Sequence, residues 1–298
     1  MSTAPAGAVY DRGYRPYVGP RGGRAASVLA LYRTSVRRAL GLRRSWRQKV
    51  APFVLLGIVT IPAIVNVGIG YVTRDRIGRP IEFITYREYV GVSSALLVFV
   101  ALTAPDIVCP DRRQRVLPLL FARPLTGVGY VVAKVGAIFS ILFAFSFLPQ
   151  VLLFVGQTLV SDGALDYVRA NLDVVWKVPV AVALLAGYYA VVGVAVASLA
   201  SRRIVAGASF IGLFLVSSVS SVVLVGDFES TGRGSAAALL NILGLPLYLR
   251  DLVFLGHIDP ESPLVGVARG GLYAVAASVA VAATATAVLL YRYRWTER

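Results

Sequence analysis

Residues 50–73, VAPFVLLGIVTIPAIVNVGIGYVT, contain no charged side chain. A helix needs about 20 residues to cross the hydrocarbon core of a bilayer, so this segment is long enough to span one. Five further apolar segments follow it along the chain. We therefore predict an all-α polytopic membrane protein with six transmembrane helices. The expected spans cover residues 50–73, 89–108, 131–156, 178–200, 204–225 and 271–291.

The overall composition supports a membrane protein. Hydrophobic residues make up 57% of the 298-residue chain, the mean hydropathy is +0.73, and only 15% of residues are charged. Soluble domains have about a quarter charged residues. The net charge of +15 could suggest nucleic acid, but in a membrane protein basic residues mark the cytoplasmic side, so we expect no nucleic-acid partner. The single cysteine, Cys109, excludes an internal disulfide.

The distribution of basic residues predicts the orientation. With the N-terminus inside, the cytoplasmic segments contain 21 Lys and Arg and the outer segments contain 9. Positive residues are enriched in cytoplasmic loops, so we expect both termini in the cytosol. The loop at 74–88 is an exception, because it has four arginines on the outer side. The arginines and acidic residues of this loop are also the chain's single candidate cluster for an enzyme that acts on a lipid.

Four regions follow from the pattern. We predict a cytosolic tail over 1–23, an interfacial helix over 24–47, a transmembrane domain over 48–291 and a cytosolic C-terminus over 292–298. The interfacial helix is amphipathic, with apolar residues on one arc and arginines beside it. In the long outer loop at 226–270 we expect a pair of short helices before the last span. The residues that define the interfacial helix are Leu29, Tyr32, Arg33, Val36, Arg37 and Leu40.

The chain shows no motif for conventional catalysis. It has no phosphate loop, no nucleophile elbow and no cluster of Cys and His, so we expect no enzyme activity and no bound cofactor. Lys134 lies near a predicted span end, from which its amine can reach the interface. The polar residues Asn66, Gln150 and Gln157 lie within spans. They either join helices by hydrogen bonds or line a substrate path.

The connector between the second and third spans combines charge and leucines. Its central stretch, DRRQRVLPLLFARP at 111–124, is predicted to be cytoplasmic and helical over about three turns, and Pro118 is expected to kink or divide the helix. An apolar patch on an exposed helix favours docking into the groove of a partner, whereas the alternative is a solvated or headgroup-binding loop. The residues we expect to form the contact are Asp111, Arg112, Arg113, Arg115, Leu117, Leu119, Leu120 and Phe121.

These features together resemble the permeases of ATP-binding-cassette (ABC) transporters of the type-2 family. The resemblance covers nearly the whole chain: the basic helix at 24–47, RVLPLLFARPLTGVGYVVAK at 115–134, GYYAVVGVAVASLASRR at 187–203, and the short helical pair before the last span. The tail YDRGYRPYVGPRGGR resembles those of actinobacterial permeases. One departure is PDRRQRV at 110–116, where many relatives have an acidic stretch followed by glycine.

The resemblance implies an exporter subunit in a bacterial plasma membrane. Two such permeases, identical or sister chains, would pair, and each would be served by a separate ABC ATP-binding subunit that hydrolyses ATP. The connector at 111–124 and the helix at 24–47 would contact that subunit. The residues alone leave two other classes open: a polytopic enzyme acting on a lipid, and a channel or scaffold. They do not identify the substrate.

Overall fold

The computed structural model describes residues 22–42, 46–77, 84–90, 93–122, 124–229 and 235–294. Within these ranges every regular element is helical. The elements are α1 Arg24–Ala39, α2 Trp46–Ile77, α3 Tyr86–Val90, α4 Ser93–Arg113, α5 Leu117–Phe121, α6 Gly127–Val160, α7 Ala164–Ala170, α8 Leu172–Leu199, α9 Arg203–Glu229, the 3-10 helix η1 Ala236–Leu240, α10 Leu245–Leu255 and α11 Gly270–Arg294.

Six helices in the described part of the chain are long and apolar enough to cross a membrane. They correspond to the six expected spans, and they indicate a multi-pass membrane protein. Each helix extends beyond the predicted apolar segment at one end or both; α6, for example, adds four residues at each end of the predicted 131–156. The second span, predicted from residue 89, lies within the candidate membrane span Tyr86–Arg113, whose described parts are α3 and α4.

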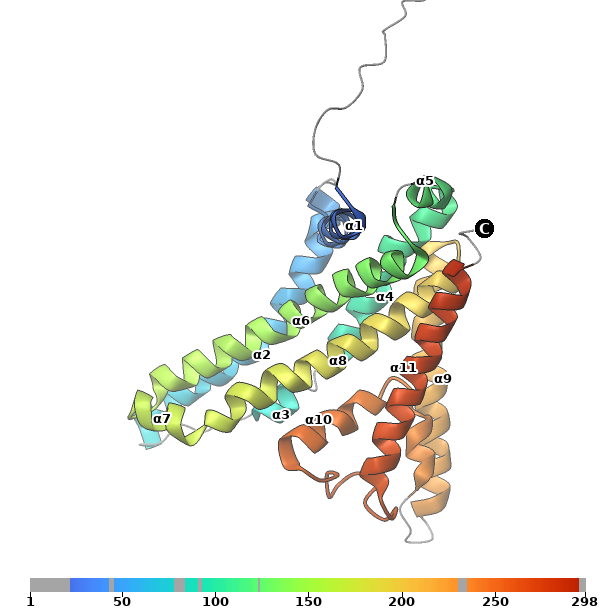
Figure 1. Cartoon of the computed structure of the whole chain (residues 1–298). Coiled ribbons are helices and arrows are strands. Elements are labelled where there is room, and N and C mark those ends of the chain that lie inside the picture. The colour runs from blue at the N-terminus through green and yellow to red at the C-terminus, as the bar shows by residue number, and fades with distance from the viewer. Residues whose placement is uncertain are drawn as a thin grey trace, which may run out of the picture.

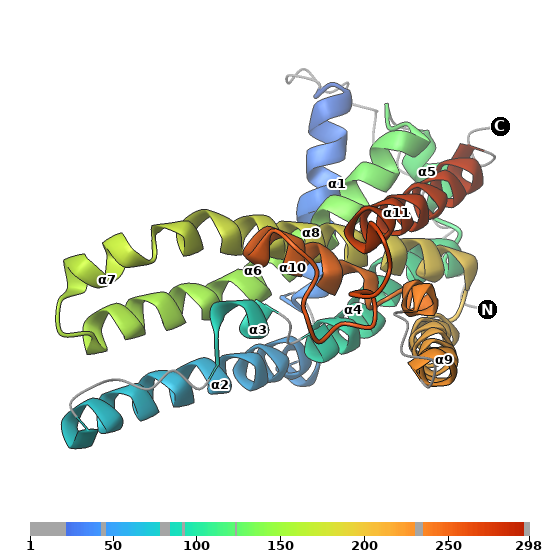
Figure 2. The ribbon, with the colours of Figure 1, turned by 90° about the horizontal axis from the view of Figure 1, so that it is seen from below.

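Helices α4, α6 and α8 form the centre of the molecule. Figure 2 shows α6 and α8 side by side along most of their length, with α7 joining them at one end and α2 beside α6. Helix α4 packs against both α8 and α9, and α11 packs against α8. The outer faces of α2, α9 and α11 carry exposed apolar side chains, such as Ile61, Val216 and Val279, as expected of surfaces that face lipid.

Two glycines allow the central helices to approach closely. A Cβ atom at Gly193 of α8 would lie 2.3 Å from a methyl group of Val100 in α4. A Cβ atom at Gly156 of α6 would lie 2.4 Å from a methyl group of Val67 in α2. Small residues at helix contacts are typical of membrane proteins, where close packing replaces the hydrophobic effect as the source of association.

Helix α1 packs along the first half of α6. A Cβ atom at Gly129 of α6 would lie 3.0 Å from Val28, and one at Gly136 would lie 3.8 Å from the Tyr32 ring. The Tyr32 hydroxyl donates a hydrogen bond to Ser140 Oγ at 2.9 Å. These contacts fix the position of α1 on the helical bundle.

The two ends of the molecule differ. Figure 1 shows α1, α5 and the C-terminal end of α11 at one end, and α7, α3 and α10 at the other. We call these the α5 end and the α10 end. The short link from α8 to α9, residues 200–202, also lies at the α5 end.

Two predicted boundaries change. The interfacial helix was expected to run to residue 47, but α1 ends at Ala39, because Gly41 adopts a φ of 66° and the amide of Leu42 donates to the carbonyl of Arg37. Residues 43–45 lie outside the described ranges, as do 1–21 of the predicted tail. Helix α11 continues to Arg294, so it includes the start of the predicted cytosolic C-terminus. The expected outer pair consists of η1 and α10.

Candidate functional site

The connector helix α5 is much shorter than predicted. Asp111 to Arg113 complete α4, and only Leu117–Phe121 form α5. The segment is divided, which was one of the two effects expected of Pro118, but the division comes before Pro118, which lies in the first turn of α5. The break occurs at Arg115, which has a φ of 52°. The amide of Val116 donates to the carbonyl of Asp111, and the amide of Arg115 to the carbonyl of Arg112. This is the hydrogen-bond pattern that usually ends a helix at glycine, here with arginine in the left-handed position.

Helix α5 has no buried residue. Leu119 is the most exposed of its leucines, with 70% of its surface accessible, whereas Leu117, Leu120 and Phe121 are half-buried. The Phe121 ring packs edge-on against Tyr130 of α6, with 6.1 Å between ring centroids. Arg113 and Arg115 are exposed beside the helix. Part of the predicted contact surface is therefore available to a partner.

Asp111 does not belong to that surface, and this corrects the prediction. It is only 6% exposed, and its carboxylate contacts Lys134 Nζ at 2.6 Å. The Tyr130 hydroxyl donates to it at 3.0 Å, and Arg38 of α1 lies at 3.4 Å. Lys134 also donates to the carbonyl of Ile107 at 3.0 Å. Asp111 thus joins α4, α6 and α1.

Lys134 departs from its predicted role as well. It was expected to extend to the interface, but it is 2% exposed and its ammonium group is fully engaged by Asp111, Ile107 and the face of the Tyr130 ring. Tyr130 packs in turn against Tyr293 of α11, with 4.6 Å between ring centroids. Buried charges require such pairing, so we call Arg38, Asp111, Tyr130 and Lys134 the buried ion cluster.

Arg112 also faces inward. Its guanidinium donates to the carbonyl of Ala200 at 3.2 Å and to that of Ser198. These carbonyls lie at the C-terminal end of α8, where the helix leaves them without internal donors. Nearby, Arg203 at the start of α9 forms an ion pair with Asp106 of α4. The α5 end of α4 is therefore attached to α8 and α9 by its own side chains.

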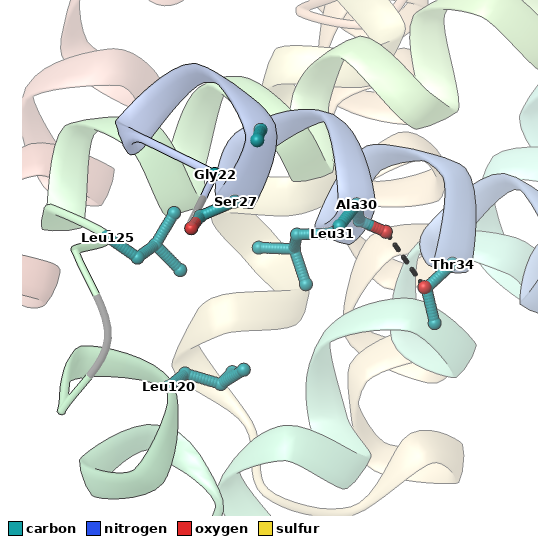
Figure 3. A pocket seen from close by; sticks show the side chains of 8 residues that line it. Gly22, Ser27, Ala30, Leu31, Thr34, Leu120 and Leu125 are labelled. Carbon is teal, nitrogen blue, oxygen red and sulfur yellow. Dashed lines mark hydrogen bonds between the residues drawn. The ribbon is translucent and has the colours of Figure 1, made fainter. Parts of the chain in front are cut away.

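A cavity of about 400 Å³ separates α1 from α5. Figure 3 shows Leu31 from α1, Leu120 from α5 and Leu125 from the segment before α6 around it. The dashed line in the figure is the bond from the Thr34 hydroxyl to the carbonyl of Ala30, at 2.8 Å. The two elements predicted to contact one partner therefore lie next to each other, with an apolar groove between them.

The predicted face of α1 is shifted by about one position. Leu29 is 46% exposed, although it was assigned to the apolar arc. The buried stripe instead centres on Ser35 and Ala39. Tyr32, Val36 and Leu40 are half-buried, and Arg33 and Arg37 are exposed as predicted.

The intramembrane polar residues separate into two kinds. Asn66 is 2% exposed and donates to the carbonyl of Ile84 at 2.9 Å, so it holds the segment before α3 against α2. Gln157 is 3% exposed and lies against Gly70 of α2. Gln150 is 2% exposed and lines a cavity between α6 and α8. The three residues do not form one path.

The α10 end contains a second charged cluster that the sequence analysis missed. Arg87 of α3 contacts Asp259 at 2.8 Å and Asp251 of α10 at 3.9 Å, and Arg250 contacts Asp251 at 2.6 Å. Burial raises the pKa of the Asp251 carboxyl above its usual value, against the opposing effect of the two arginines. The backbone N–H of Glu261, together with Arg87, lowers the pKa of Asp259. This cluster connects α3, α10 and the loop that follows α10.

The lipid-enzyme alternative depended on the acids and arginines at 74–88. Arg74 forms an ion pair with Asp162 at 2.9 Å and donates to the carbonyl of Val160. Arg87 belongs to the charged cluster at the α10 end. Residues 78–83 and the side chain of Asp75 lie outside what the structure describes. Among the described residues, no group of three or more His, Cys, Asp or Glu side chains is arranged to hold a metal.

Comparison with known proteins gave no match to a family model, to a curated protein or to a solved structure. The site is therefore interpreted from its own geometry.

Proposed function

We propose that this chain is the permease subunit of an ATP-driven ABC transporter, an exporter of the type-2 class in a bacterial plasma membrane. It has no ATPase site of its own, and it pairs with a second permease. A separate ATP-binding subunit docks on α5 and α1. The observation that carries the proposal is that α5 is an exposed apolar helix next to α1, and that buried ion pairs join α4, α6 and α1 beneath it. We call these ion pairs the base of α5.

That base makes α5 suitable for transmitting force. Asp111 and Lys134 connect the ends of α4 and α6 immediately before and after the connector. Arg38 and Tyr32 attach α1 to the same two helices. Displacement of α5 or α1 by a partner therefore moves the long helices together, because packed helices with paired buried charges shift as rigid bodies.

The charge distribution supports a cytosolic α5 end. Exposed arginines at this end include Arg33, Arg37, Arg113 and Arg115. The α10 end instead carries Asp162, Asp166, Asp173, Asp251, Asp259 and Glu261 beside its basic residues. Basic residues on the inner side and a mixed outer side agree with the rule for bacterial membrane proteins. Both termini would then be cytosolic, where ATP is available.

Co-purification tests the proposal. Burying a leucine fully stabilises by about 1.5–3 kcal/mol, so the 70% of Leu119 that is exposed could contribute about 1–2 kcal/mol to docking. Leu119→Ala should therefore weaken ATPase association about 5- to 30-fold, and Leu119→Asp should abolish it, because the carboxylate would be buried unpaired. The purified chain alone should hydrolyse no ATP, and the complex should hydrolyse it.

Leu165 provides a matched control. It is 72% exposed on another short helix, α7, at the α10 end. Leu165→Asp should leave the co-purified ATPase unchanged. Equal amounts of ATPase with all variants, or ATP hydrolysis by the isolated chain, would contradict the proposal.

A further inference from the structure

A cavity of about 160 Å³ lies between α6 and α8, in the halves of these helices nearer α7. It is separate from the groove beside α5. Two of its lining residues, Val151 and Val175, are 40% and 54% exposed, so the cavity opens at the outer surface of the helix pair. An exposed apolar surface of this kind is suited to contact lipid in a membrane. The lining residues are Phe147, Gln150, Val151, Phe154, Val174, Val175, Val178 and Pro179.

Gln150 is the one side chain in this lining with hydrogen-bonding groups. It is 2% exposed, and neither its carbonyl oxygen nor its amide nitrogen has a hydrogen-bond partner within the described structure. A buried polar group without a partner destabilises the fold, so native proteins rarely keep one without a reason. Gln150 therefore places an unpaired acceptor and an unpaired donor in the wall of an otherwise apolar cavity.

The prolines at this site leave further backbone acceptors. Pro179 has no amide hydrogen, so the carbonyl of Val175, one turn earlier in α8, lacks its usual helical donor. In α6, Pro149 has the same effect on the carbonyl of Phe145. Val175 is one of the residues that line the cavity, whereas Phe145 and Pro149 are not.

Gln157 is a second buried glutamine in α6, and its amide nitrogen also lacks a hydrogen-bond partner among the described residues. It lies seven residues after Gln150, and its carbonyl oxygen would lie 3.4 Å from a Cβ atom at Gly70 of α2. It is packed between helices and does not line the cavity. Gln150 differs from Gln157 in two ways: both of its amide atoms are unpaired, and it lines the apolar cavity.

We propose that this cavity binds an amphiphile taken directly from the bilayer. Its body is an alkyl segment or a single ring, since apolar cavities of about 150 Å³ bind benzene in other proteins. It has one polar group that both donates and accepts a hydrogen bond, namely a hydroxyl, an amide or a protonated carboxyl, which pairs with the Gln150 amide. The identification of such a molecule as transport cargo rests on the proposed function; its binding does not.

Photolabelling of the full chain in lipid nanodiscs tests this inference. The probes are a medium-chain alcohol with a diazirine near its methyl end and the corresponding hydrocarbon without the hydroxyl. The alcohol should label the segments 147–154 and 174–179 in preference to the hydrocarbon. Gln150→Leu should reduce alcohol labelling there roughly five- to tenfold, as expected for the loss of one or two buried hydrogen bonds. Labelling by the hydrocarbon should not change.

Gln157→Leu is the matched control, because it removes another buried amide from the same helix and should leave labelling of the cavity unchanged. Gln150→Leu should also raise the melting temperature slightly in the absence of probe, since it removes an unpaired polar group. Equal labelling by the two probes, or undiminished alcohol labelling of a folded Gln150→Leu variant, would overturn the inference. ATP and ATPase are absent from this assay, so its failure would leave the docking proposal intact.

Discussion

The contact between Asp111 and Lys134 gives the most quantitative prediction. The two side chains are 8% and 3% exposed, and the distance between their charged atoms is 2.6 Å. Asp111→Asn should lower the free energy of unfolding by about 3–5 kcal/mol, because Lys134 would remain buried with only the carbonyl of Ile107 as a strong partner. Lys134→Met should cost less, about 1–3 kcal/mol, since Asp111 keeps Tyr130 and Arg38.

The double variant separates pairing from packing. Combining Asp111→Asn with Lys134→Met should be less destabilising than Asp111→Asn alone, because no unpaired buried ammonium remains. The measurement is equilibrium unfolding in detergent micelles. Asp166→Asn is the control, since its pair with Arg169 is highly exposed and should contribute less than about 0.5 kcal/mol. Equal effects of Asp111→Asn and Asp166→Asn, or a double variant as unstable as the sum, would refute a buried pair.

Three further outcomes are expected. Arg115→Gly should stabilise the fold by about 1 kcal/mol in thermal unfolding, because glycine adopts a φ of 52° without strain; a loss of stability would contradict this geometry. Gly193→Ala should destabilise by about 1–3 kcal/mol, since the added methyl group overlaps Val100; an unchanged melting temperature would show that α4 and α8 are not so close. Asp259 has a lowered pKa, so its contribution to stability is present above its usual pKa of 3.8 and is lost as the pH falls through the lower pKa of the folded state. Asp259→Asn should therefore destabilise the fold at neutral pH and have no effect in strong acid. An equal loss of stability at both pH values would contradict the pairing with Arg87.

The six long helices could be predicted from the sequence because apolar runs of this length have few alternatives in water or lipid. Their ends could not, since helices continue past the apolar core wherever hydrogen bonds and caps allow. Gly41 was a readable signal for the end of α1. Arg115 was not, because arginine rarely adopts the left-handed conformation that shortens the connector helix.

The candidate site was only partly predictable, for a related reason. The exposure of Leu119, Arg113 and Arg115 could be expected from their pattern, whereas Arg112 turns inward to α8. The inward role of Asp111 could not, because its partner Lys134 lies 23 positions later and meets it only when α4 and α6 pack together. The ion cluster around Arg87 at the α10 end depends in the same way on segments far apart in the chain. Gln150 was visible as a polar residue in a span, but its cavity required the packing of α8.

The central claim is that α5 lies on the cytosolic side, where an ATPase can reach it. Cysteine labelling measures this directly, with Leu119→Cys and Leu165→Cys compared in bacterial cells by a membrane-impermeant maleimide. Cys109 is buried and should give little background. The account predicts that position 165 reacts in intact cells and that position 119 reacts only after permeabilisation. Reaction of position 119 in intact cells would contradict it, because no ATP-hydrolysing subunit could then bind there.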